Sequence, residues 1–251
     1  MQTATKAIVT FSRIRKELDR EHAARLADAR HYIEKGFFPT WAEEHRTDPD
    51  RGLKAHSTPA KWDAYTAGTL SREKAVELAY KRAAKEEEKR HTKDMEKVTQ
   101  AETAAPVIDI AISVEWKRSY TWGHNPTATV TVHSADGWKQ YTGTASGCGY
   151  DKLTAAVGSA LNQSPAVLNM LYTAKEKAYR KSTASDRKAW NGSNRDAIHY
   201  GAGYGLLPYF DGGVGWSSFQ GVFEACGYKV TNRHETKTTD YFFIEKAGRA
   251  K

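Results

Sequence analysis

Cysteine is scarce in this chain: Cys148 and Cys226 are its only two cysteines in 251 residues. Two thiols cannot form a disulfide scaffold, and they suit a protein in a reducing compartment. No apolar run approaches the roughly 20 residues of a membrane-spanning helix, and the N-terminus lacks the apolar core of a signal peptide. We therefore expect a soluble protein of the cytoplasm.

Catalytic motifs are missing as well. The nine histidines are scattered, and none pairs with a cysteine or a glutamate at a metal-binding spacing. The sequence has no Walker A phosphate loop, no Rossmann glycine spacing and no Gly-x-Ser-x-Gly elbow. A Cys148 nucleophile with a distant histidine stays open, although a buried thiol is the preferred interpretation. We expect a protein that is not an enzyme, without catalytic residues, metal or cofactor.

Positive charge is in excess. The chain carries 38 Lys and Arg against 30 Asp and Glu, which gives a net charge of +8. This balance favours acidic partners such as nucleic acid, because neutralised phosphates release their counterions. Many soluble proteins are equally basic, so an ordinary charged surface stays open as the alternative.

The composition changes near residue 104, and only three of the 19 glycines precede this point. The change predicts a helical, charged N-terminal region over 1–104 and an α+β domain over 105–251. The fold class is therefore α+β: a helical N-terminal half with a long charged helix, then a small antiparallel sheet packed with helices.

The N-terminal half shows helical periodicity that ends at Gly36. Residues 45–60 contain prolines and a glycine and predict a loop, followed by a short helix that carries Trp62 and Tyr65. Ser71 is typical of an N-cap for a helix to about residue 100. Because the apolar face of this helix fades after Ala84, the helix is interpreted as a solvated arm, a weak coiled coil or a spacer.

The C-terminal half predicts strands over 107–116, 127–133 and 139–145, with a hairpin turn at Asp136-Gly137. A helix follows Gly149. Ser164 is expected to cap the next helix, with Pro165 in its first turn. A short helix over 217–226 and a last hairpin complete the pattern. The strands of this hairpin are expected over 229–233 and 241–245.

Residues 122–161 contain Gly123-His124-Asn125-Pro126, then a strand hairpin, then a glycine-rich turn that opens an Ala-rich helix. This order resembles the second half of a double-stranded-RNA-binding domain. The resemblance implies that His124 lies in a minor-groove loop and that Lys152 meets phosphate at the helix N-terminus. The sequence departs from the family in having Asp151-Lys152 where paired lysines are usual, and a predicted strand where the family has its first helix.

The C-terminal half also resembles small accessory proteins encoded by phages and prophages of Gram-positive bacteria. The motifs behind this likeness are Thr121–Pro126, Ser146–Lys152, Gly212–Phe219 and Ala225–Tyr228. The resemblance implies a location in the cytoplasm of a bacterial host cell. It also implies a compact, non-enzymatic antagonist of host defence, with anti-CRISPR activity as the sharpest form.

The sequence thus predicts a non-catalytic phage protein that inhibits a nucleic-acid-guided host nuclease by docking on it or on its guide-RNA complex. The alternative is a stand-alone RNA- or DNA-binding protein of phage metabolism. The long helix over 71–103 offers a route to a dimer. Aromatic and basic residues could stack on bases and contact phosphate. The residues expected to bind nucleic acid or a partner are His124, Lys139, Tyr150, Lys152, Lys175, Lys177, Arg180, Lys181, Trp122 and Trp216.

Overall fold

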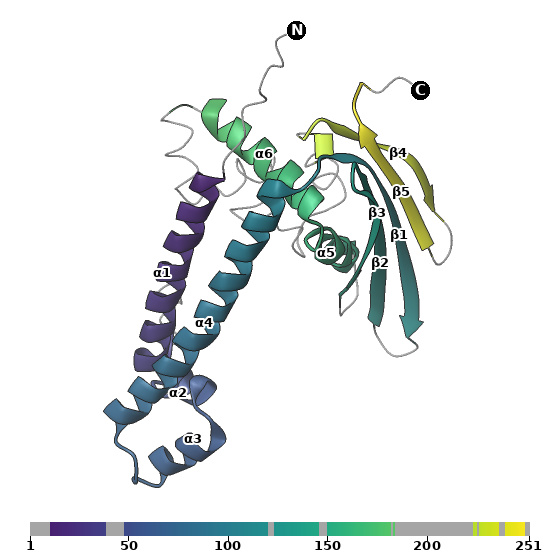
Figure 1. Cartoon of the computed structure of the whole chain (residues 1–251). Coiled ribbons are helices and arrows are strands. Elements are labelled where there is room, and N and C mark those ends of the chain that lie inside the picture. The colour runs from purple at the N-terminus through teal and green to yellow at the C-terminus, as the bar shows by residue number, and fades with distance from the viewer. Residues whose placement is uncertain are drawn as a thin grey trace. The chain divides into compact units, whose positions relative to one another are not determined.

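A computed structural model describes residues 11–38, 48–119, 123–145, 150–181, 183, 223–224, 226–235 and 239–248. Helices and an antiparallel sheet are both present, and helices make up the N-terminal half, so the predicted α+β class is confirmed (Figure 1). In chain order the elements are α1 (Ser12–Lys35), α2 (Arg51–His56), α3 (Pro59–Thr66), α4 (Arg72–Thr103), β1 (Val107–Ser119), β2 (Gly123–Ser134), β3 (Gly137–Thr144), α5 (Tyr150–Leu161), α6 (Pro165–Lys181), β4 (Tyr228–Glu235) and β5 (Thr239–Lys246).

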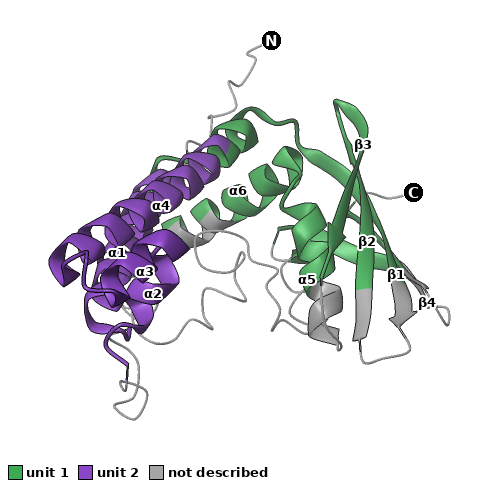
Figure 2. Cartoon of the chain, turned by 90° about the horizontal axis from the view of Figure 1, so that it is seen from below, with its two compact units in different colours: residues 1–14, 97–251 green, residues 15–96 purple. Residues whose placement is uncertain are grey.

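The chain divides into two compact units, which Figure 2 colours separately. One unit consists of residues 15–96 and is helical in its described part. The other consists of residues 1–14 and 97–251 and contains the sheet. The predicted boundary near residue 104 stays a prediction.

The helical unit begins and ends its helices largely where the sequence indicates. Gly36 follows α1 with a φ of +81°, in the left-handed region that favours glycine. The Ser71 hydroxyl accepts a hydrogen bond from the Lys74 amide at 3.3 Å, so Ser71 caps α4 as predicted. The predicted short helix is α3, which carries Trp62 and Tyr65.

Helix α2 lies inside the segment 45–60, so the part of the loop prediction over residues 51–56 is wrong. The prediction rested on Pro49, Gly52 and Pro59, of which Gly52 lies within α2. A Cβ at Gly52 would lie 1.8 Å from the Tyr32 carbonyl oxygen at the end of α1. Glycine is therefore required here because two helices approach closely, and not because the chain turns.

Helix α4 is not a bare solvated arm. Small side chains on one face of α4 pack with Ile33 of α1 and Leu53 of α2 in a buried apolar cluster. The α4 members are Ala75, Ala79 and Ala83. One turn further along α4 the contacts become polar: Arg25 Nε donates to Glu87 at 2.5 Å, and the His22 and His91 rings stack with centroids 4.4 Å apart. The face that a dimer through α4 would use is thus partly covered by the chain's own helices.

The sheet has five antiparallel strands in the order β3-β2-β1-β5-β4. The hairpin between β2 and β3 pairs Ser134 with Gly137, whose φ is +93°. The C-terminal hairpin also forms as predicted, and β5 pairs with β1 at the centre of the sheet. The first two strands of the sheet are longer than predicted. Pairing between them extends to Ser119 in β1 and to Gly123 in β2.

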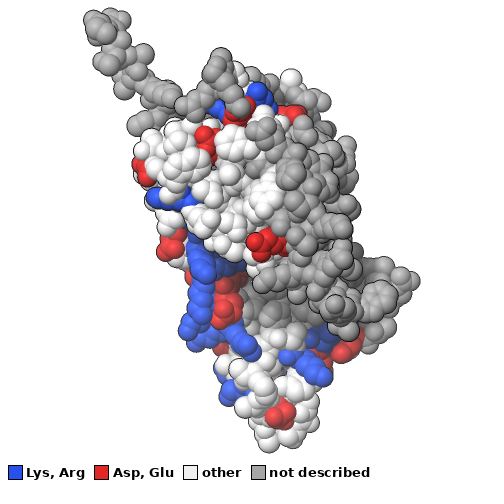
Figure 3. All heavy atoms as spheres, turned by 90° about the vertical axis from the view of Figure 1, so that its right-hand side faces the viewer, with Lys and Arg blue, Asp and Glu red and all other residues white. Residues whose placement is uncertain are grey.

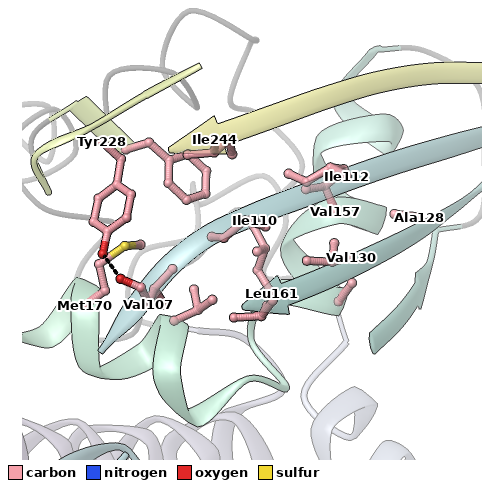
Figure 4. Packing of buried hydrophobic residues seen from close by; sticks show 14 of the residues in the cluster. Val107, Ile110, Ile112, Ala128, Val130, Val157, Leu161, Met170, Tyr228 and Ile244 are labelled. Carbon is pink, nitrogen blue, oxygen red and sulfur yellow. Dashed lines mark hydrogen bonds between the residues drawn. The ribbon is translucent and has the colours of Figure 1, made fainter. Parts of the chain in front are cut away.

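Helices α5 and α6 cover one face of this sheet, and Figure 4 shows the apolar cluster between them. The Ser164 hydroxyl accepts from the Val167 amide at 3.4 Å, which confirms the predicted cap of α6. The Tyr228 hydroxyl donates to the Val107 carbonyl oxygen at 2.7 Å and so fastens the start of β4 to the start of β1. Burial, with a smaller contribution from Cys226, raises the pKa of Tyr228 to about 12, so the phenol stays a donor at neutral pH.

Gly143 of β3 sets how closely α5 lies on the sheet. A Cβ at this position would meet the Ala156 carbonyl oxygen at 2.1 Å and the Ala160 amide nitrogen at 2.5 Å. Both atoms belong to the backbone of α5, so a side chain can be accommodated only by moving the helix. The glycine therefore permits direct contact between strand and helix.

We predict that Gly143→Ala lowers the free energy of unfolding by at least about 2 kcal/mol, because overpacking displaces α5 from the core beneath it. Thr142→Ala, at the exposed neighbouring position of β3, is the matched control and should change it by less than about 0.5 kcal/mol. Urea denaturation monitored by circular dichroism measures both. Equal stability of the two variants would contradict this account of α5 packing.

Candidate functional site

The face of the sheet opposite α5 and α6 is the candidate site, and we call it the outer face. Strand β2 defines it by alternation: Ala128, Val130 and Val132 are buried toward the helices, and the residues between them point the other way. Figure 3 views the molecule from this side, and the surface over the sheet is largely free of Lys, Arg, Asp and Glu.

A row of five side chains crosses the outer face, one from each strand, and we call it the cross-strand row. The strand registers pair its members successively, each directly opposite the next. In order from β3 to β4 they are Trp138, His133, Asp109, Glu245 and Lys229. Side chains directly opposite in antiparallel strands have Cβ atoms about 5 Å apart, so neighbours in the row are close enough to interact.

The contacts in the row link its neighbours in pairs. The Trp138 and His133 rings stack with centroids 4.2 Å apart and an interplanar angle of 6°. His133 Nδ1 lies 3.3 Å from Asp109 Oδ2, and Lys229 Nζ lies 3.3 Å from Glu245 Oε1. The two carboxylates stand beside each other in the middle of the row, and each has its basic partner on its far side.

Behind this row the outer face is neutral for two further rows. The described side chains there are mostly hydroxyl-bearing or aromatic, and the strand registers place them opposite one another. They are Gln140, Thr131, Ala111, Phe243 and Thr231 in the first row, and Thr142, Thr129, Ser113 and Tyr241 in the second. Glu115 and Thr127 follow at the far margin. The centre of the outer face therefore lacks charge, and its charged residues lie at two margins.

Two large hydrophobic side chains are exposed among the described residues, and both lie on the outer face. Trp138 is 57% exposed and Tyr241 is 45% exposed. They stand on different strands and in different rows, at opposite corners of the neutral area. Both rings thus face the side of the sheet opposite the helices that pack against it.

Of the predicted binding residues, the structure describes the side chains of three, which lie on two different elements. Lys139 is exposed on β3 and points to the helix-covered side, next to Trp138 but opposite in direction. Lys177 and Arg180 are exposed on the last turns of α6, which leads away from the sheet (Figure 1). These two elements carry the predicted cations that the structure describes with their side chains.

The remaining predicted residues are described by their backbone only or fall outside the described part of the chain. The backbone of His124 pairs with Arg118 of β1, so His124 belongs to β2. Tyr150 and Lys152 lie in the first turn of α5, and Lys175 and Lys181 lie in α6. Trp122 and Trp216 lie outside the described residues. α4 precedes β1, so the order helix–strand–strand–strand–helix is present, although β5 and β4 extend the sheet beyond it.

The described residues offer little for catalysis. No three of their His, Cys, Asp or Glu side chains are placed to hold a metal ion. Burial raises the pKa of the Cys226 thiol to about 12, so this cysteine is almost entirely a thiol at neutral pH and a poor nucleophile. Cys148 lies outside the described residues. Over the same part of the chain, no helix is long and apolar enough to cross a membrane.

No protein-family model, curated protein or solved structure matches the chain.

Sequence reasoning missed the cross-strand row. A signal for two of its five members was available, because the alternation of β2 and the hairpin at Gly137 place His133 opposite Trp138. Asp109 and Glu245 are 136 positions apart, and only the pairing of β1 with β5 makes them neighbours.

We predict that Cys226 reacts with iodoacetamide about a thousandfold more slowly than an unperturbed cysteine at pH 8.5, because a thiol with a pKa near 12 holds few thiolates there. The Cys148→Ser variant leaves Cys226 as the only thiol, and mass spectrometry follows its alkylation. The same variant in 6 M guanidinium is the control and should react at the ordinary rate. Rapid alkylation of the folded variant would contradict the burial of this thiol.

Proposed function

We propose that this chain is a non-catalytic binding protein that docks on a protein partner through the outer face of its sheet. The observation behind the proposal is that Trp138 and Tyr241, the two exposed large hydrophobic side chains of the described residues, frame one neutral surface. Protein interfaces have charge-depleted centres that are enriched in aromatic residues, with polar rims. The outer face has this arrangement.

The size of the surface agrees with a modest interface. Five strands at about 4.8 Å spacing and four rows at about 6.8 Å span on the order of 400 Å². This is about half of what one partner contributes to an interface of standard size. The docking surface therefore has to extend past the described rows, over the strand edges or other parts of the chain.

The charges of the outer face favour a protein over a nucleic acid. The described side chains on it include three carboxylates, from Asp109, Glu115 and Glu245, and one lysine, Lys229, which already pairs with Glu245. Phosphates laid across the described part of this surface would meet more carboxylates than cations. The exposed aromatics alone would suit base stacking, but the electrostatics oppose it.

The class of partner comes from the sequence. The resemblance of the C-terminal half to small phage and prophage proteins leads us to propose a nucleic-acid-guided defence nuclease of a bacterial host as the partner. In this proposal the protein inhibits the nuclease by occupying its surface, and performs no chemistry of its own. The acidic groups of the outer face support the choice, because nucleases that bind nucleic acid carry basic surfaces.

We predict that the double variant Trp138→Ala/Tyr241→Ala binds its nuclease at least about thirtyfold more weakly, as expected when interface hot spots are truncated. Pull-down and cleavage assays against guide-RNA nucleases, with and without guide RNA, measure binding and inhibition. Lys177→Ala, at an exposed position of α6 on the side of the sheet opposite the outer face, is the matched control and should bind like the wild type. Binding that survives the double variant would contradict docking through the outer face.

A stand-alone nucleic-acid-binding protein is the second candidate, and the exposed Lys177 and Arg180 on α6 favour it. This function requires affinity for free duplex or single strand that falls steeply with salt. It also requires that Lys177→Glu and Lys139→Glu weaken that affinity, and that Trp138→Ala/Tyr241→Ala does not. Filter-binding titrations at 50 and 200 mM salt separate the two functions.

A further inference from the structure

The described side chains of the outer face carry a net charge of opposite sign to that of the whole chain. The described side chains on it sum to two negative charges, from three carboxylates and Lys229, whereas the chain has a net charge of +8. We infer that the outer face docks on a protein surface that presents arginine or lysine side chains. This inference rests on the proposed function, because it names the partner chemistry for the same face.

The cross-strand row supplies the strongest argument. Asp109 and Glu245 are directly opposite in neighbouring strands, and like charges in such positions destabilise a sheet. Asp109 has His133 as its neighbour on β2, and Glu245 has Lys229 as its neighbour on β4. No described cation lies above the two carboxylates themselves. The Asp109 and Glu245 side chains keep 15% and 16% of their surface exposed. A cationic side chain of a partner placed over this pair would approach both carboxylates from that exposed side, and an arginine fork suits such a pair.

The aromatic end of the row fits the same partner. Trp138 is exposed, and its ring already stacks on His133 in parallel. Indole faces attract cations, and arginine is the more frequent partner. A partner with several basic side chains can thus contact the carboxylate pair and the indole together. The row spans about 19 Å, the length of an extended segment of about six residues.

The same charges argue against two other occupants. A second copy placed face to face would bring two negative surfaces together, and nucleic acid would bring phosphates to the carboxylates. Only a cationic surface gains electrostatic energy from Asp109, Glu115 and Glu245. Because exposed charges are screened within about 8 Å at physiological salt, the gain acts at contact distance.

The test uses the full chain and a labelled ten-residue peptide of alternating arginine and serine, with a glutamate–serine peptide for comparison. Fluorescence anisotropy should show binding of the arginine peptide only, weakening as salt is raised. Asp109→Asn/Glu245→Gln should weaken this binding about fivefold, whereas Lys229→Ala should strengthen it about twofold, since it removes the one described cation of the face. A merely structural disturbance would weaken binding in both variants.

Several outcomes overturn the inference: no binding of the arginine peptide, equal binding of both peptides, or no opposite effect of the two sets of substitutions. The nuclease assay separates this failure from that of the proposed function. If Trp138→Ala/Tyr241→Ala no longer binds the nuclease while Asp109→Asn/Glu245→Gln binds it with full affinity, docking through the outer face is supported and the inference of a cationic partner surface is wrong. If the aromatic variant keeps the nuclease, both proposals fail.

Discussion

The register between β1 and β5 is the constraint on which the outer face depends. Ile110 pairs with Ile244, and both are buried toward the helices. Side chains alternate along a strand, so a shift of one residue would move Ile244 to the outer face and Glu245 into the core. The apolar cluster under α5 and α6 therefore holds the cross-strand row in place. The row is a consequence of the packing on the opposite side of the sheet.

Tyr228 and Gly143 secure this arrangement at its two ends. The Tyr228 hydroxyl bonds to the Val107 carbonyl oxygen and ties the edge strand β4 to the beginning of β1. At the other edge, the missing side chain of Gly143 lets the α5 backbone reach β3. Each contact fixes one outer strand of the sheet against the core. The outer face can therefore remain open on one side without losing support from the other.

Local signals were sufficient to predict the elements, but not how they assemble. Alternation in residues 127–133 and the turn before Gly137 predicted β2 and its hairpin, and Ser71 and Ser164 predicted two helix starts. Gly52 contributed to the loop prediction over residues 45–60. A glycine that permits close helix packing cannot be told from a turn glycine by sequence alone. The candidate site could not be predicted, since β5 reaches β1 from the far end of the chain. The basic composition of the chain predicted a binding site built on lysines, whereas the described surface around the exposed aromatic residues is acidic.

The outer face contains more than a sheet needs for stability. Threonines on β2 and β3, such as Thr129 opposite Thr142, supply β-branched side chains with cross-strand contacts and keep the surface compatible with water. Trp138 adds exposed apolar surface at the sheet edge, where association with other chains is a standing risk. The ring stacks on His133 in the same row as Asp109 and Glu245, and this combination is the basis on which we propose that it recognises a partner.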